Sequence, residues 1–116
     1  MKRILCLHGK SQSGAVLSNK IAGARRKLAR VYELDFLDAP IEEDKDGLQL
    51  AWWLRDDKGN EILVENAFDY VLKQTEGKHY DALLGFSQGG LLATALAVSG
   101  KLPGIQAVLT AGSPYR

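Results

Sequence analysis

The chain has 116 residues, of which 46% are hydrophobic, a size and composition typical of one globular domain over residues 1–116. Its 15 basic and 14 acidic residues nearly cancel, so the net charge gives no electrostatic case for binding nucleic acid or an anionic membrane. The single cysteine excludes an internal disulfide, and no apolar run approaches the roughly 18 residues of a membrane span. The apolar run near the N-terminus is also too short for a signal peptide, so we expect a cytoplasmic protein.

Strand and helix patterns alternate from the N-terminus. Residues 3–7 are an apolar run followed by a loop rich in Ser, Gln and Gly, which predicts a buried strand. Apolar residues then recur with helical spacing over 16–28, between lysines and arginines, which predicts one amphipathic helix with a solvated basic face. Residues 31–37 alternate in polarity and end shortly before Pro40, as expected of a second strand.

The middle of the chain breaks this regularity. Residues 41–60 are polar and irregular, and we expect a long loop there. Trp52 and Trp53 in this loop are candidates for a lid or for the wall of an acyl pocket. Packing of the loop onto the domain explains them equally well.

The alternation of helices and strands resumes after this loop, with element ranges 64–72, 80–86, 88–99 and 105–111. Strands separated by helices predict right-handed crossovers and a mainly parallel sheet with the order 2-1-3-4, and therefore a three-layer α/β/α sandwich. The last strand has the sequence of a buried parallel strand but lies at an edge in this order. We therefore expect the chain to be truncated after the fourth strand, or the edge to be covered by self-association.

A Gly-x-Ser-x-Gly motif lies where the predicted strand 80–86 meets the next helix, with Gly85 and Gly89 flanking Ser87. In a nucleophile elbow the serine occupies a sharp, strained turn, and side chains two positions before and after it would collide with backbone. We therefore predict that Ser87 is a nucleophile and that the N–H of Gln88, at the helix start, faces a developing oxyanion. The alternative is a glycine-rich turn in which Ser87 only caps the helix.

His8 and Gly9 follow the first predicted strand, where this architecture places the loop that donates the second oxyanion N–H. Gly9 would let the backbone approach a substrate closely, and the donor that we expect is the N–H of Lys10. His8 is a candidate substrate contact, although a structural role explains it at least as well. A phosphate-binding loop at Gly9-Lys10-Ser11 is excluded, because the first glycine of that motif would fall at Ile4.

Three separated blocks of the sequence resemble the FSH family of serine hydrolases, which includes the ovarian-cancer-associated protein 2 type of esterase. The blocks are Leu5–Gly9, Leu34–Pro40 and Tyr80–Gly89. The resemblance implies an α/β-hydrolase fold without cofactor or metal, Ser87 as the nucleophile, and a small-molecule carboxylic ester or thioester as the substrate. In this family the triad acid and the general-base histidine follow the serine, and this chain stops before them.

Other residues are poor substitutes for that base and acid. His79 precedes the strand 80–86 and so lies at the opposite end of the sheet from Ser87. His8 is at the correct end but belongs to the oxyanion loop, and Asp35 and Asp38 are typical turn and loop residues. We expect the acid and base in a missing C-terminal part. The alternative function is a catalytically inactive, hydrolase-like domain that binds a partner.

Overall fold

Four parallel strands form the central sheet. The computed structural model describes residues 2–43, 49–55, 58, 61–62 and 64–111. The order of the strands is β2-β1-β7-β8, and every neighbouring pair is parallel. Their bounds are β1 (Lys2–Leu7), β2 (Tyr32–Leu37), β7 (Ala82–Phe86) and β8 (Ala107–Ala111). This arrangement confirms the predicted order 2-1-3-4 and the α/β class.

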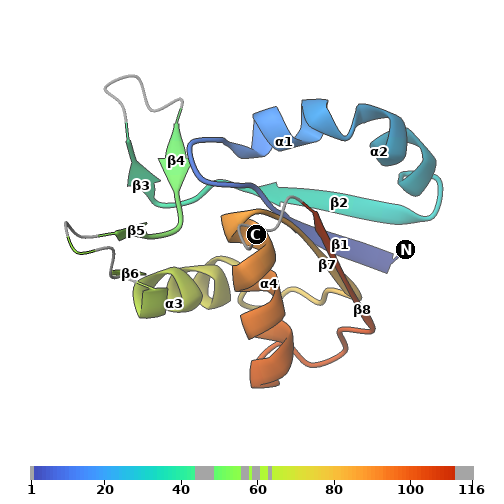
Figure 1. Ribbon diagram of the computed structural model, residues 1–116. Helices are drawn as coiled ribbons and strands as arrows, with labels where there is room; N and C mark the ends of the chain where they lie inside the picture. The colour runs from blue at the N-terminus through green and yellow to red at the C-terminus, as the bar shows by residue number, and fades with distance from the viewer. Residues whose placement is uncertain (1, 44–48, 56–57, 59–60, 63, 112–116) are drawn as a thin grey trace.

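Helices cover both faces of the sheet (Figure 1). Successive side chains of β1 point to opposite faces, so Ile4 and Cys6 pack with Leu17 of α1, whereas Leu5 and Leu7 belong to a larger cluster with residues of α3 and α4. The arrangement is the expected three-layer α/β/α sandwich. The helices are α1 (Gly14–Lys20) and α2 (Ala22–Leu28) on one face, and α3 (Val64–Gln74) and α4 (Gln88–Ser99) on the other.

The prediction of one helix over 16–28 is wrong, because the structure has two helices there. Ser13 begins α1 by accepting a hydrogen bond from the N–H of Val16 at 3.2 Å. The chain turns at Ile21, whose backbone angles of φ −103° and ψ 24° leave the helical range, and α2 follows directly. Apolar periodicity does not reveal this break, since Leu17 and Ile21 pack in the same cluster.

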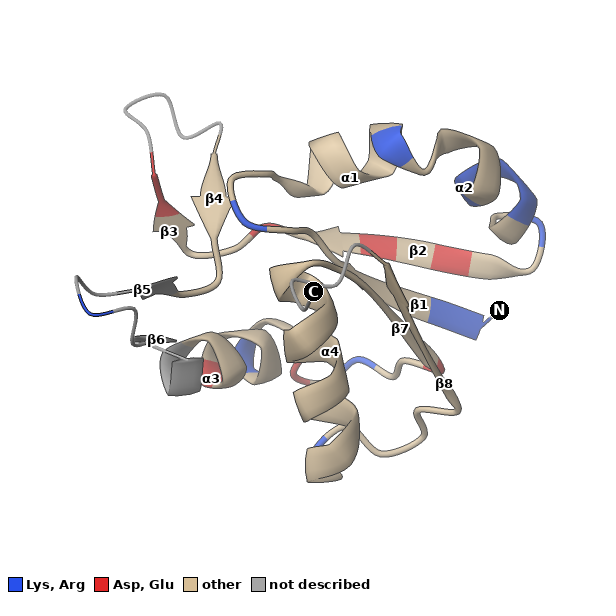
Figure 2. Ribbon diagram, viewed as in Figure 1, with Lys and Arg blue, Asp and Glu red and all other residues tan. Residues whose placement is uncertain are grey.

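Basic residues gather on α2 and on the turn that follows it, as Figure 2 shows. Arg26 and Lys27 are exposed, in keeping with the solvated basic face predicted for this region. A cavity of about 670 Å³ lies between α2 and β2, and its walls contain neither the predicted serine turn nor the loop after β1. The cavity is therefore separate from the predicted site at the ends of the strands β1 and β7.

The prediction of a long irregular loop over 41–60 is also wrong. Within this segment β3 (Ile41–Glu42) pairs antiparallel with β4 (Leu50–Ala51). A second antiparallel pair joins β5 (Leu54–Arg55) to β6 (Glu61–Ile62), which lies just after the segment. An isolated bridge joins Gln12 to Leu50. Residues 44–48, 56–57 and 59–60 of the expected loop lie outside the described residues.

Trp52 and Trp53, directly after β4, belong to the hydrophobic core. They are 0% and 3% exposed and pack in the cluster that also contains Leu5 and Leu7. This placement agrees with packing of the segment onto the domain. A role of either side chain in a lid or an acyl pocket stays a prediction.

The strand β8 forms one edge of the sheet. Among its residues only Val108 is partly buried, and the side chain of Leu109 is 48% exposed. Val98, on the helix α4 that packs against β8, is 83% exposed. The sequence of β8 is that of a strand buried on both faces, yet within the described residues this strand is largely uncovered. Its outer edge has no neighbouring strand there and offers unpaired backbone groups.

Candidate active site

Ser87 occupies a strained turn between the end of β7 and the start of α4. Its backbone angles are φ 56° and ψ −118°, a conformation that non-glycine residues rarely adopt. Ser87 stands at the N-cap position of α4, but its side chain makes no capping hydrogen bond. The alternative of a serine that only caps the helix therefore lacks the bond that defines it.

The two glycines of the motif are required by the packing of this turn. A Cβ on Gly85 would overlap the carbonyl group of Gly89, and a Cβ on Gly89 would overlap the carbonyl oxygens of Leu7 and His8. The turn is thus pressed onto the end of β1. This contact explains sterically why glycine stands two positions before and two positions after Ser87.

The loop after β1 passes directly beside Ser87. Gly9 is buried, and a Cβ added to it would lie 3.2 Å from both the Cβ of Ser87 and the carbonyl oxygen of Phe86. The N–H of Gly9 donates to Oε1 of Gln12 at 2.9 Å, so it is already engaged. Among the backbone hydrogen bonds of the described residues outside the helices and strands, none is donated by the N–H of Lys10 or of Gln88. Their role as oxyanion donors stays a prediction.

His8 has a structural role. It is fully buried, with its Nδ1 2.7 Å from the carbonyl oxygen of Gly9 and its Nε2 2.9 Å from the N–H of Ala39. These partners assign the proton to Nδ1, because Nε2 must accept from an amide. Burial lowers the pKa of His8, although the Gly9 carbonyl and Asp38 oppose the shift. With both nitrogens engaged and the ring buried, these contacts favour the structural role of His8 over a substrate contact or a general base.

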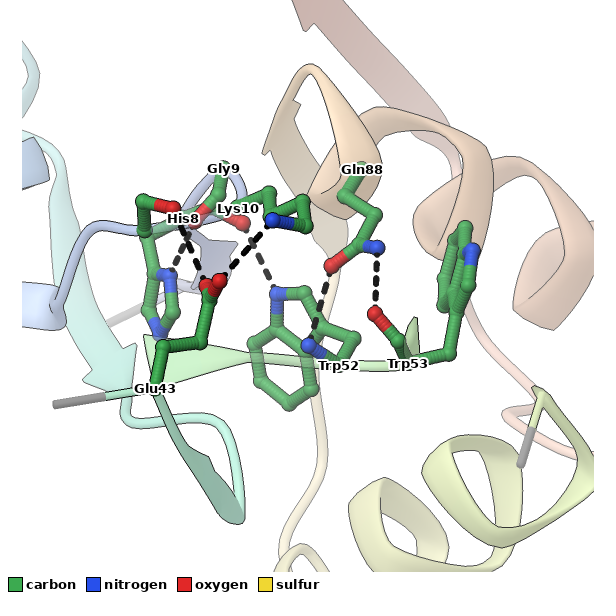
Figure 3. Close-up of polar contacts among 8 residues, drawn as sticks. His8, Gly9, Lys10, Glu43, Trp52, Trp53 and Gln88 are labelled. Carbon is green, nitrogen blue, oxygen red and sulfur yellow. Dashed lines mark hydrogen bonds and ion pairs between the residues drawn. The ribbon is translucent and has the colours of Figure 1, made fainter. Parts of the chain in front are cut away.

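The side chain of Gln88 is a feature that the sequence analysis missed. It is buried, its Oε1 accepts a hydrogen bond from the N–H of Trp52 at 2.9 Å, and its Nε2 donates to the carbonyl of Trp53 at 2.8 Å. The indole Nε1 of Trp52 donates to the carbonyl of His8 at 2.8 Å (Figure 3). The only sequence signal was a long polar residue two positions after a buried strand. The serine motif pointed to the backbone N–H of this residue and not to its side chain.

The loop after β1 is also held from β3. Glu43, just after β3, accepts from Nζ of Lys10 at 2.8 Å and from Oγ of Ser11 at 3.0 Å (Figure 3). Burial raises the pKa of Glu43, but the hydrogen bonds from Lys10 and Ser11 outweigh it, so the pKa lies below the ordinary value. Ser11 itself has a positive φ of 63°. Contacts distant in sequence thus fix this loop in a strained conformation.

The remaining candidates for a catalytic acid and base are engaged elsewhere. His79 precedes β7 and pairs with Asp81 at 3.2 Å, at the opposite end of that strand from Ser87. Asp35 accepts from the hydroxyl of Tyr80 at 2.6 Å, and Asp38 accepts from the N–H of Gly14 at 2.7 Å. Neither carboxylate has a hydrogen bond to a histidine in the described part of the chain.

The described residues contain neither a candidate metal site nor a candidate membrane-spanning helix. They contain no group of three or more His, Cys, Asp or Glu side chains placed to hold a metal ion. None of the helices described is long and apolar enough to cross a membrane.

A parallel sheet between helical layers, with a strained serine at the end of a central strand, defines the class of α/β-hydrolases. Residues 1–108 match the family described as serine hydrolase (FSH1), and the chain belongs to that family. This result confirms the resemblance found in the sequence.

Several curated relatives of this chain are named esterases. An esterase of Caenorhabditis elegans is 32% identical over 124 residues, which cover 90% of this chain and 56% of the relative. An esterase of Drosophila melanogaster is 35% identical over 106 residues, with 75% and 37% covered. The esterase OVCA2 of Danio rerio is 28% identical over 123 residues, with 81% and 54% covered. The chain thus spans about half or less of the length of these relatives.

Solved structures agree on the fold. Crystallised Arabidopsis thaliana SOBER1 superimposes with a TM-score of 0.53 at 23% identity, over 82% of this chain and 54% of that protein. At this identity the likeness supports the fold alone.

Proposed function

We propose that the chain provides the nucleophile and the oxyanion donors of a serine hydrolase that cleaves carboxylic esters or thioesters of small molecules. The observation that carries the proposal is the backbone of Ser87, held at φ 56° without a capping bond. Such a conformation costs on the order of 1–3 kcal/mol and persists only where surrounding structure enforces it. Here the enforcing contacts hold Ser87 at the end of the sheet, and its side chain makes no capping bond to α4.

The proposed reaction has two stages. In the first, Oγ of Ser87 attacks the carbonyl carbon, a histidine takes the hydroxyl proton, and the bond to the alcohol or thiol breaks as that group is reprotonated. In the second, water releases the acid from the acyl-enzyme by the reverse sequence. The N–H groups of Lys10 and Gln88 would stabilise the oxyanion in both stages. This chemistry needs neither a metal nor a cofactor.

We propose that the base and its acid partner come from outside the described residues. Of the two histidines in the sequence, His8 has both nitrogens engaged and His79 lies at the far end of β7. A serine without a base retains only the contribution of binding and of the oxyanion hole, a small part of the full rate enhancement.

Labelling with a fluorophosphonate ester tests the nucleophile, since covalent capture requires an activated serine. The 116-residue chain, its Ser87→Ala variant and the full-length esterase of C. elegans would be labelled in parallel, and the adduct mapped by mass spectrometry. Ser18→Ala, on α1, is the matched control. Adduct at Ser87 that disappears only in Ser87→Ala supports the proposal.

A second candidate is a hydrolase-like domain that binds a partner without catalysis. The engagement of both nitrogens of His8 favours it, because no described histidine is free beside Ser87. Absence of adduct in the short chain both with and without added imidazole as an external base, with the C. elegans esterase labelled at its own serine, would support this candidate for the 116-residue chain.

A further inference from the structure

The side-chain amide of Gln88 pairs with the backbone of the segment after β4 as a neighbouring strand would. One end accepts from the N–H of Trp52 and the other donates to the carbonyl of Trp53, at 2.9 and 2.8 Å. The residue is only 7% exposed, so these bonds form away from water. The first residue of α4 therefore fixes the position of Trp52.

Trp52 in turn holds the loop after β1. Its indole N–H donates to the carbonyl of His8 at 2.8 Å, and its ring stacks on the His8 ring with centroids 5.1 Å apart. The same carbonyl of His8 lies against Gly89, on the first turn of α4. The contacts therefore close a ring that runs from α4 through Trp52 to the loop and back to α4. Figure 3 shows its hydrogen-bonded steps, from Gln88 to Trp52 and from Trp52 to His8.

We infer that the Gln88 side chain is a positioning residue that acts through Trp52 to hold the loop 8–12 in register with the serine turn. The consequence is geometric. Gln88 is the first residue of α4 and Lys10 belongs to the loop, so the separation of their N–H groups depends on the contacts that hold the loop against α4. For its effect on catalysis the inference rests on the proposed function, but the coupling itself does not.

The chemistry of the side chain explains why glutamine stands here. The segment presents a donor at Trp52 and an acceptor at Trp53, and a terminal amide satisfies both. A carboxylate at this position would face the Trp53 carbonyl without a proton to donate. An apolar side chain of equal length would leave both backbone groups unsatisfied in a buried place.

Amide hydrogen exchange of the whole 116-residue chain tests the coupling without requiring activity. Gln88→Met removes both bonds while keeping the length of the side chain, and Trp52→Phe removes the indole donor while keeping a ring beside His8. Gln74→Met, at the exposed end of α3, is the matched control. Exchange is read for the loop 8–12 and, as an internal reference, for the buried strands β1 and β7.

We expect both variants to raise exchange in the loop about fivefold or more while β1 and β7 stay unchanged, with Gln74→Met like the parent chain. The double variant should add little to the larger single effect, because both residues belong to one series of contacts. If exchange rises only around Trp52 and Trp53, or rises equally in β1 and β7, the inference is overturned.

A second readout separates this inference from the proposed function. If the parent chain labels with fluorophosphonate, Gln88→Met should slow the labelling of Ser87 about tenfold or more, since small displacements of oxyanion donors are costly. If the parent chain does not label even with added imidazole, the proposed function fails for this chain, and the exchange data still decide the coupling.

Discussion

Gly9 lies so close to Ser87 that a Cβ on Gly9 would be 3.2 Å from the Cβ of the serine. Two segments separated by most of the chain thus meet at one point, where the ends of β1 and β7 lie side by side. The contact has no room for a side chain between them. It places the loop after β1 directly beside Ser87, next to the space that a substrate attacked by this serine would occupy.

Gly9→Ala tests this contact. The added methyl would be tighter than ordinary van der Waals contact with Gln12, Phe86 and Ser87. We expect a stability loss of about 1 kcal/mol and a larger proportional loss of fluorophosphonate reactivity, because the displaced groups include the serine and the oxyanion loop. Urea unfolding and labelling rates measure the two effects, and equal reactivity of variant and parent would contradict the prediction.

Gly89→Ala should be far more damaging. Its Cβ would overlap the backbone at Leu7 and His8, which cannot move without shifting β1. We expect destabilisation of about 3 kcal/mol or more, at the upper end for overpacked sites. Gly23→Ala is the control, since that glycine is also helical but a Cβ there meets nothing within 4 Å, and alanine should stabilise α2 by up to about 1 kcal/mol. Similar urea midpoints for the two variants would refute the steric account.

His8 makes stability dependent on pH. Burial lowers its pKa in the folded chain below the ordinary 6.5, so the unfolded chain binds the proton more readily. The contribution of neutral His8 is present above pH 6.5 and is lost as the pH falls towards the lowered value. In urea unfolding from pH 7.5 to 5 the parent chain should lose stability, and His8→Gln, which does not titrate, should lose less. Parallel curves would show that His8 is not the group responsible.

Glu43 makes the free energy of unfolding depend on pH over a lower range than His8 does. Its pKa lies below the ordinary 4.5, so its stabilisation is present above that pH and is lost as the pH falls through the lowered value. Since the Lys10 side chain is 48% exposed, we expect Glu43→Gln to cost no more than about 1 kcal/mol at pH 7. The difference between variant and parent should shrink as the pH falls below 4.5 and vanish once Glu43 is protonated in the folded chain. A difference that persists there would mean that Glu43 acts by packing instead of charge.

The open edge at β8 should promote self-association. Its strand carries no charged residue, and Leu109 is 48% exposed. We expect the chain to form dimers with rising concentration in sedimentation velocity, and Leu109→Lys to return it to monomer. Val31→Lys is the control, since Val31 is also exposed, at 58%, but precedes β2 at the other edge. Dimers that respond to Val31 and not to Leu109 would place the interface elsewhere.

Local patterns in the sequence predicted the regular parts of the fold. The helix α4 spans the predicted residues 88–99, and the strand order follows from βαβ connectivity. The short strands β3 and β4 could not be predicted, because each has two residues and depends on partners far along the chain, such as the bridge from Gln12 to Leu50. Propensity over so few residues carries little information.

The candidate site likewise has a part that could be predicted from the sequence and a part that could not. The glycines around Ser87 follow from a steric rule that a motif records, so their positions could be read from the sequence. The roles of His8 and the Gln88 side chain depend on which nitrogen or oxygen meets which backbone group. These pairings are set by tertiary packing around Trp52, and the sequence pattern left the role of that tryptophan open.

Labelling in the presence of imidazole tests the central claim, that Ser87 is a nucleophile in need of a base, most directly. A small diffusible base can occupy the space of a catalytic histidine beside the serine. The account predicts that imidazole accelerates fluorophosphonate capture by the 116-residue chain, with the adduct mapped to Ser87, lost in Ser87→Ala and retained in Ser18→Ala. Capture that ignores imidazole, or an adduct that survives Ser87→Ala, would contradict it.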